Sequence, residues 1–251
     1  MTIVQRQYIL LTILFVATSL FSESNKVGKV SFFMGNAKIK TILAEKWKPI
    51  KMNLPISAGD RIQTVKAEVV EITLSDGSVL RVAEESDVAI LSPNAKAVSA
   101  DVKSGRLWAN IKKLSKRNYE FEVTSGTATA AIRGTIVAMD KVAADSATAV
   151  KVYDGKVEVG PGADLAAAQA ATRGTAGTER KEISGPGEVP GPFEVSLMEW
   201  VAIVKGQQIN VRPDGKYHKF NFDQQRDAQD SWVKFNQERD KVAAISHEEQ
   251  K

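Results

Sequence analysis

From Val27 to Val159 the chain alternates between apolar and polar residues in short runs, and glycines separate these runs. A period of two is that of a β-strand with one buried face, because successive side chains point to opposite faces. The clearest unit places residues 70–74 and 80–82 on either side of Asp76-Gly77, a dipeptide that favours a tight hairpin turn. Asp154-Gly155 joins two further runs in the same way. The pattern predicts short antiparallel strands and disfavours a parallel fold with alternating helices.

The runs follow one another closely, and no helical periodicity interrupts them before residue 160. This predicts a mainly β fold, either an antiparallel sandwich or a twisted solenoid-like β domain, with a partly open barrel as a third option. In the charged tail that ends the chain, Trp232, Phe235, Arg239 and Val242 recur at helical spacings. We therefore expect a C-terminal helix whose narrow apolar stripe docks on its own domain, in preference to a partner protein.

Composition divides the chain into five segments. Residues 1–24 are expected to be a signal peptide and residues 25–160 a β domain. Residues 161–192 form an Ala/Gly/Pro-rich linker, whose alanine-rich first half is able to form a short helix. Residues 193–221 return to apolar character and are expected to rejoin the core as strands, and residues 222–251 carry the C-terminal helix.

The first segment sets the expected compartment. Arg6 precedes an uncharged run that ends at Ser22, which is the layout of a secretory signal peptide. Its strongly apolar part is shorter than the roughly 20 residues that a spanning helix needs, so cleavage near Asn25 is favoured over an uncleaved anchor. We expect an extracytoplasmic protein, periplasmic in the first instance, with exposure on the cell surface as the alternative.

Charge and cysteine content narrow the classes of partner and chemistry. The chain contains no cysteine, which excludes disulfides, thiolate metal sites and a cysteine nucleophile. The net charge is +4 and the pI is about 9.1. This excess of positive charge is small, and we expect it to be spread along the chain. In an exported protein such a balance favours acidic proteins or anionic cell-wall polymers over nucleic acid, with membrane contact expected only through residues 1–24.

A search for catalytic patterns predicts no catalytic, cofactor-binding or metal-ligating residue, and we do not expect an enzyme. There is no G-x-S-x-G elbow, no H-E-x-x-H and no phosphate loop, and the two histidines, His218 and His247, lie late in the chain. Acidic pairs such as Glu84-Glu85 are adjacent in sequence, whereas glycosidases need two carboxylates that face one cleft. An envelope hydrolase is therefore the least favoured alternative.

Two features are candidates for a partner-binding surface. A basic cluster of Lys112, Lys113, Lys116 and Arg117 lies between two predicted strands, where a solvated loop is the simpler interpretation. Trp108 alternates out of phase with its apolar neighbours, so it faces either a second layer or solvent, and an exposed tryptophan would anchor a partner.

Short motifs built around glycine and aspartate punctuate the strands: Gly59-Asp60, Asp76-Gly77, Gly105-Arg106, Ile132-Arg133-Gly134-Thr135 and Asp154-Gly155. In this order, between Gly28 and Val159, they resemble the FecR domain family. The resemblance implies a β-rich extracytoplasmic module that, in iron-uptake regulators, sits on one membrane helix and relays the state of an outer-membrane transporter to a sigma factor. Those regulators carry a cytoplasmic segment before the membrane helix, where this chain has residues 1–7, so direct control of a sigma factor is not expected.

Within these motifs we favour structural roles over binding roles. Gly134 and Gly155 are expected to supply turn geometry, and Asp60 and Asp76 to cap turns through bonds to nearby backbone N–H groups. Arg133 follows an apolar run, and we expect it to be buried against an internal carboxylate, with a role in ligand binding as the alternative. The leading hypothesis is a non-catalytic interaction or signalling module of the cell envelope, and the alternative is a surface adhesin or cell-wall-binding protein.

Overall fold

The computed structural model describes residues 26–42, 44, 46–94, 97–113, 120–141, 147–175, 195–197 and 199–248. The predicted signal peptide, most of the predicted linker, and Lys116 and Arg117 of the basic cluster lie outside these residues. Within them, strands dominate and helices are few, so the predicted mainly β fold with a helix near the C-terminus is confirmed.

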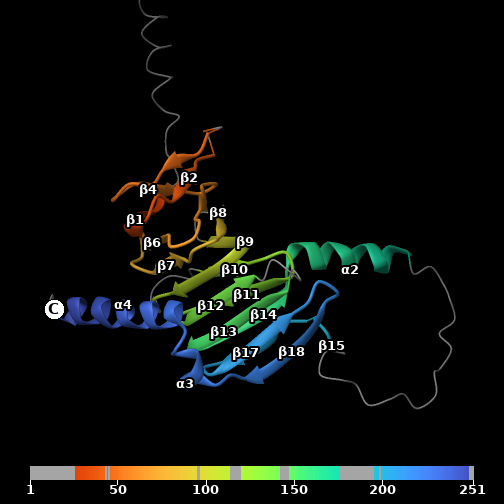
Figure 1. Cartoon of the computed structure of the whole chain (residues 1–251). Coiled ribbons are helices and arrows are strands. Elements are labelled where there is room, and N and C mark those ends of the chain that lie inside the picture. The colour runs from red at the N-terminus through yellow and green to blue at the C-terminus, as the bar shows by residue number, and fades with distance from the viewer. Residues whose placement is uncertain are drawn as a thin grey trace, which may run out of the picture.

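The strands form one connected network that folds into two layers (Figure 1). The first layer runs in the spatial order β4 (Pro55–Ser57), β1 (Lys26–Met34), β6 (Val69–Leu74), β7 (Val79–Val82), β9 (Ala97–Asn110), β12 (Ile136–Lys141), β13 (Thr148–Asp154), β17 (Gln207–Val211), β18 (Lys216–Asn221) and β15 (Val195–Ser196).

The second layer runs in the order β3 (Lys48–Pro49), β2 (Lys38–Lys40), β5 (Arg61–Gln63), β8 (Asp87–Asn94), the first half of β9, β10 (Glu120–Thr124), β11 (Ala128–Ile132), β14 (Lys156–Pro161) and β16 (Val201–Val204). Pairing is antiparallel throughout the described strands except between β10 and β9, which run parallel. The sheet does not close.

Strand β9 belongs to both layers. Its residues 97–104 pair with β8 and β10 in the second layer, and residues 105–110 pair with β7 and β12 in the first. The change occurs at Gly105, whose φ is 86°. A side chain at Gly105 would lie 2.5 Å from the Cα of Ser86, so only glycine combines this backbone angle with this close approach.

The main core fills the space between the layers. Strands β11 and β13 alternate between buried and partly exposed positions, as the sequence pattern predicts for strands with one inward face. Their inward residues, among them Ala130 and Val152, pack with Leu107 and Phe121 in one continuous apolar cluster. Burial of aliphatic side chains on this scale is the main source of stability of the layered fold.

Helices lie outside the two layers. Helix α2 (Ala163–Thr175) follows β14, and α3 (Gln224–Asp227) precedes α4 (Ser231–Glu248), which covers part of the outer face of the first layer. Asp230 caps α4, since its Oδ1 accepts hydrogen bonds from the backbone N–H groups of Trp232 and Val233. None of the described helices combines the length and the apolar character needed to cross a membrane.

The predicted docking of the C-terminal helix is present, but the buried face differs from the predicted stripe. Trp232 is buried and Phe235 is half-buried, whereas Val242 is 67% exposed. The inward face passes instead through Val233 and Asn236, both fully buried. The helix is rotated because its inner face carries polar side chains that meet partners on the sheet.

Candidate interaction surface

Five strand connections meet side by side at one end of the layers. They comprise residues 76–78, 111–113, 133–135, 154–156 and 205–206, which we call the turn row. The backbone N–H of Lys112 donates to Ser78 Oγ at 3.0 Å, and Ile111 and Thr135 exchange two backbone hydrogen bonds. The backbone N–H of Lys205 donates to the carbonyl of Gly155 at 3.1 Å. These bonds fix the positions of the turns relative to one another.

The motif residues of the turn row serve its local geometry. Asp76 accepts hydrogen bonds from the backbone N–H and the hydroxyl of Ser78, at 2.8 and 2.9 Å. Thr135 Oγ1 donates to the carbonyls of Arg133 and Lys156. Gly155 has a φ of 84° and lies against Gly134, whose own φ is 63°. The polar groups of these turns are therefore used within the fold.

The other motif residues lie away from the turn row. Asp60 is buried, and its carboxylate accepts the backbone N–H of Ser57 at 2.8 Å, while burial raises the pKa of this carboxyl. Gly59 has a φ of 91° in the same turn. Gly105 marks the point at which β9 changes layer. These motif residues therefore also serve the local fold.

The expected burial of Arg133 against a carboxylate is wrong, because its side chain is exposed. It extends from a turn, beyond the end of the strand whose apolar residues suggested a core position. Lys112 and Lys113 are also exposed on the turn row. Two further lysines there make weak surface pairs, Lys156 with Glu158 and Lys205 with Asp154, each at 3.4 Å. The described part of the row thus presents several cations to solvent.

The hypothesis that Trp108 is an exposed partner anchor is wrong, since this residue is 1% exposed. It lies on the outer face of the first layer, beneath α4, with its ring centroid 4.4 Å from that of Tyr153. Its indole N–H donates to Asp240 Oδ2 at 3.0 Å. The other predicted option, a second layer above the strand, describes its position.

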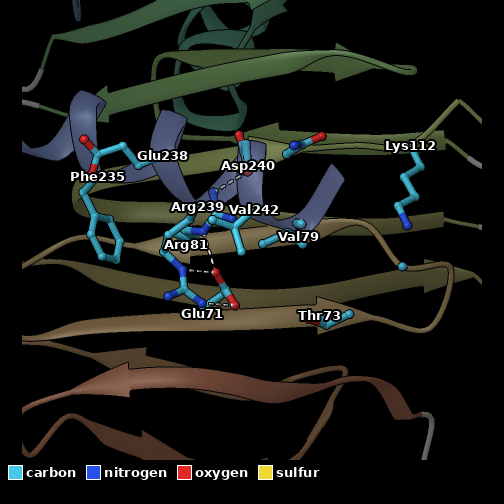
Figure 2. Close-up of a pocket in the computed structure, with 13 residues that line it drawn as sticks. Glu71, Thr73, Val79, Arg81, Lys112, Phe235, Glu238, Arg239, Asp240 and Val242 are labelled. Carbon is cyan, nitrogen blue, oxygen red and sulfur yellow. Dashed lines mark hydrogen bonds and ion pairs between the residues drawn. The ribbon is translucent and has the colours of Figure 1, made fainter. Parts of the chain in front are cut away.

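Helix α4 is held to the sheet by a charged clamp, which consists of Glu71, Arg81, Arg239 and Asp240 (Figure 2). Arg81 Nε donates to Glu71 Oε2 at 2.6 Å, and Arg81 Nη1 donates to Asp240 Oδ1 at 2.7 Å. Arg239 donates two hydrogen bonds to the Glu71 carboxylate, at 2.8 and 3.0 Å. Two carboxylates and two guanidinium groups therefore form a closed network between β6, β7 and α4.

Because the charged clamp is largely buried, losing one of its charges would be costly for stability. Arg81 is 1% exposed, and an unpaired charge at that depth would be strongly unfavourable. Burial of the Glu71 carboxyl acts to raise its pKa, but the hydrogen bonds from Arg239 and Arg81 outweigh this effect and lower the pKa to about 2. Glu71 is thus a carboxylate at all physiological pH values.

A second polar cluster fixes the segment that leads into α4. Asp227 accepts hydrogen bonds from Lys151 Nζ at 2.5 Å and from the hydroxyl of Tyr153 at 2.6 Å. Burial and this hydrogen bond raise the pKa of the Tyr153 phenol. Arg106 pairs with Asp230 at 3.2 Å and also with Asp140. Burial raises the pKa of the Asp140 carboxyl. Both ends of the described contact between α3–α4 and the sheet are therefore polar.

A groove of about 770 Å³ separates the C-terminal half of α4 from the β6–β7 hairpin (Figure 2). Its walls include Val79 and Val242, and Lys112 of the turn row stands at its rim. Three carboxylates line it: Glu71 and Asp240 are paired with arginines, and Glu238 is exposed. A carboxyl with a pKa of about 2 cannot donate a proton near neutral pH. In the described part of the chain, no group of three or more His, Asp or Glu side chains is placed to hold a metal ion.

A sequence model of the family described as FecR protein matches residues 60–158, the stretch that contains most of the turn row and both sheet residues of the clamp. The chain carries a FecR domain. This domain runs from the residue before β5 into β14, while α4 lies beyond it in sequence. No curated protein matches the chain.

Two solved structures are similar to parts of this chain. A candidate anti-sigma factor from Parabacteroides distasonis is 18% identical over 66% of this chain, with a TM-score of 0.45, and this chain spans 61% of that protein's length. A structure described as a cell surface anchoring domain is 23% identical over 26% of this chain and 84% of its own length, with a TM-score of 0.25.

Sequence reasoning missed the charged clamp. Arg81 and Glu71 occupy the outward positions of two alternating strands, which the pattern assigns to solvent. They lie directly opposite each other in the β6–β7 register, and a cross-strand pair of opposite charges was the available signal. The sequence of the hairpin alone does not predict that α4 covers this pair.

Proposed function

We propose that this protein is a non-catalytic, extracytoplasmic FecR-type module that binds another protein of the cell envelope and takes part in signalling. The observation that carries the proposal is the turn row. Its backbone is fixed by hydrogen bonds between neighbouring turns, while Lys112, Lys113 and Arg133 remain exposed on it. A surface that is rigid before binding loses little conformational entropy when a partner docks, so it is suited to specific recognition.

The non-catalytic part of the proposal is supported by the state of the two buried or half-buried carboxylates of the groove. Glu71 and Asp240 are engaged by arginines, and this engagement keeps α4 on the sheet. Using either group for acid–base chemistry would remove a partner from a buried guanidinium. The membership of residues 60–158 in the FecR family also favours a regulatory role.

The location is supported by the sequence of residues 1–24 and is tested directly. Protease added to spheroplasts is expected to degrade the protein while a cytoplasmic marker survives. Survival of the protein until the inner membrane is lysed would contradict an extracytoplasmic location.

The partner surface is tested by photo-crosslinking in intact cells. A photoreactive amino acid replaces Lys113 or Arg133 on the turn row, and Pro213 provides the matched control, since it is an exposed residue beyond the opposite end of β17. We expect one discrete protein adduct from the turn-row positions and none from Pro213. Equal adducts from all positions, or adducts from Pro213 alone, would refute the assignment of the surface.

A cell-wall polymer is the second candidate partner, and the exposed cations of the turn row are the observation that favours it. Binding to purified peptidoglycan would then weaken steeply as salt rises, because screening acts on exposed charges. Capture of a single protein that resists salt would favour the first candidate.

A further inference from the structure

The positive charge of this protein is concentrated in its first strands, and the expectation that the excess is spread out is wrong. Residues 26–66 hold nine of the 34 Lys and Arg residues but only two of the 30 Asp and Glu residues, which gives them a net charge of +7. The net charge of the whole chain is +4, so the rest of the protein is acidic on balance. The nine cations are Lys26, Lys29, Lys38, Lys40, Lys46, Lys48, Lys51, Arg61 and Lys66.

The fold gathers these cations at one end of the molecule, which we call the basic cap (the described part of residues 26–66). Strands β1, β2 and β4 lie at the end of the stacked strands furthest from β17 and β18 (Figure 1). Every cation of the cap is exposed except Lys40, which is half-buried. Among the described residues, Arg61 alone of the nine forms a salt bridge, to Asp87 at 2.5 Å.

Strand register places part of this charge on one face. Lys40 lies opposite Arg61, and Lys38 lies opposite Gln63, so these side chains share the outer face of the second layer. Lys48 lies opposite Ile39 in the edge strand β3, so it does not share this face, although it is exposed. Like charges on one face repel one another, so without a partner they lower stability. An opposing anionic surface would relieve that repulsion.

The basic cap also exposes apolar side chains at the tips of its loops. Ile42 after β2 is 71% exposed, Met52 between β3 and β4 is 51% exposed, and Val65 after β5 is 62% exposed. Of the eight large apolar residues that are exposed in the described part of the protein, four fall in this short stretch. Lysines and apolar loop tips are therefore combined on one end.

These features discriminate between kinds of partner. The edge strands β3 and β4 contain Pro49 and Pro55, which lack the N–H donor needed to pair with an added strand. Eight of the nine cations are lysines, whereas specific carboxylate recognition more often uses the planar fork of arginine. A hydrophilic polymer would leave the apolar tips unburied. An anionic bilayer satisfies both the lysines and the tips.

We propose that the basic cap binds the surface of an anionic phospholipid bilayer. The lysines meet headgroup phosphates, and Ile42, Met52 and Val65 enter the interfacial region. This contact is distinct from any made by residues 1–24. Because the turn row starts at the β6–β7 hairpin, beside the cap, and ends at residues 205–206, the protein-binding surface extends away from the bilayer.

The test is sedimentation with vesicles of phosphatidylcholine that contain about 30% phosphatidylglycerol, compared with pure phosphatidylcholine vesicles. The protein is purified in the form that cells produce. Pure phosphatidylcholine reports binding through the apolar run of residues 1–24, whose two charged side chains, Arg6 and Glu23, cancel. We expect at least tenfold tighter binding to the anionic vesicles, and loss of that preference between about 0.1 and 0.5 M salt.

Two double variants with the same change in net charge separate a site from a general charge effect. Lys48→Glu with Lys51→Glu is expected to weaken binding to anionic vesicles at least tenfold. Lys234→Glu with Lys241→Glu, two exposed positions on α4, is expected to change it less than twofold. Ile42→Ser with Met52→Ser should weaken binding severalfold at unchanged charge. Circular dichroism melting checks that every variant is folded.

Equal losses from the two charge variants would overturn the proposal, as would wild-type protein that shows no preference for phosphatidylglycerol. Tighter binding to poly-L-glutamate or to purified peptidoglycan than to the vesicles would assign the cap to an acidic protein or to a polymer instead. Crosslinking from the turn row does not depend on these results, so the two proposals fail separately.

Discussion

Replacement of Glu71 by Gln tests whether the charged clamp holds α4 to the sheet. Its side chain is 8% exposed and accepts hydrogen bonds from Arg81, Arg239 and Ser31. The fall in the pKa of this carboxyl from 4.5 to about 2 corresponds to about 3 kcal/mol of unfolding free energy at neutral pH. Glutamine keeps the shape but removes the charge, and its amide N–H groups face guanidinium donors.

The pH dependence follows from the direction of the shift. A carboxyl whose pKa is lower in the folded protein stabilises it fully above the unfolded pKa and progressively less as the pH falls towards 2. The difference between wild type and Glu71→Gln is therefore expected to be about 3 kcal/mol at pH 7 and about half of that at pH 3. Urea unfolding followed by circular dichroism, with the slope m compared between proteins, measures it.

Glu158→Gln is the matched control, since its pair with Lys156 is more than half exposed on both sides. This variant should lie within about 0.5 kcal/mol of wild type at every pH. A loss below about 1 kcal/mol for Glu71→Gln, or a difference that stays constant from pH 7 to pH 3, would refute the role assigned to the clamp.

Three further predictions concern the fold. Gly105→Ala should lower the unfolding free energy measured in urea by more than about 2 kcal/mol, because the new methyl group meets the Ser86 backbone in addition to the strain of a positive φ. Gly206→Ala has a similar φ but only the Gln224 side chain nearby, so it should cost about 1 kcal/mol. Equal costs for the two variants would contradict the role assigned to Gly105 in β9. Val233→Asp should lower the free energy of unfolding by at least about 3 kcal/mol, and Val242→Asp by less than about 0.5 kcal/mol, because only Val233 is buried. A lower melting temperature for Val242→Asp than for Val233→Asp would disprove this. Asp76→Ala should cost about 1 kcal/mol through loss of the two bonds from Ser78, and an unchanged midpoint would argue against that cap.

Local rules in the sequence were sufficient for the strands and their turns. Alternation in residues 70–82 with Asp76-Gly77 between the runs specifies a hairpin without tertiary information, because turn geometry and side-chain direction are local properties. The order of the motifs also sufficed to indicate the FecR family. Positions at strand ends were harder, as Arg133 shows: its apolar neighbours belong to a strand, but its own side chain extends from the following turn into solvent.

What the sequence could not supply was the identity of the element covering each face. Trp108 and Arg81 point away from the main core, and their burial depends on α4, which is more than a hundred residues distant. The rotation of that helix depends on the pairing of Asp240 and Arg239 with the sheet, whereas apolar periodicity alone favoured a stripe through Val242. The basic cap was overlooked because charge was summed over the chain and not over the strands that lie together.

The most direct test of the proposed partner surface is hydrogen exchange of the protein alone and in complex with the partner identified by crosslinking. Binding through the turn row predicts slower exchange in residues 111–113, 133–135 and 154–156 of the complex, with no change in residues 212–215 at the opposite end of the strands. Protection confined to residues 212–215 or to α4, with the turn row exchanging as in the free protein, would contradict it.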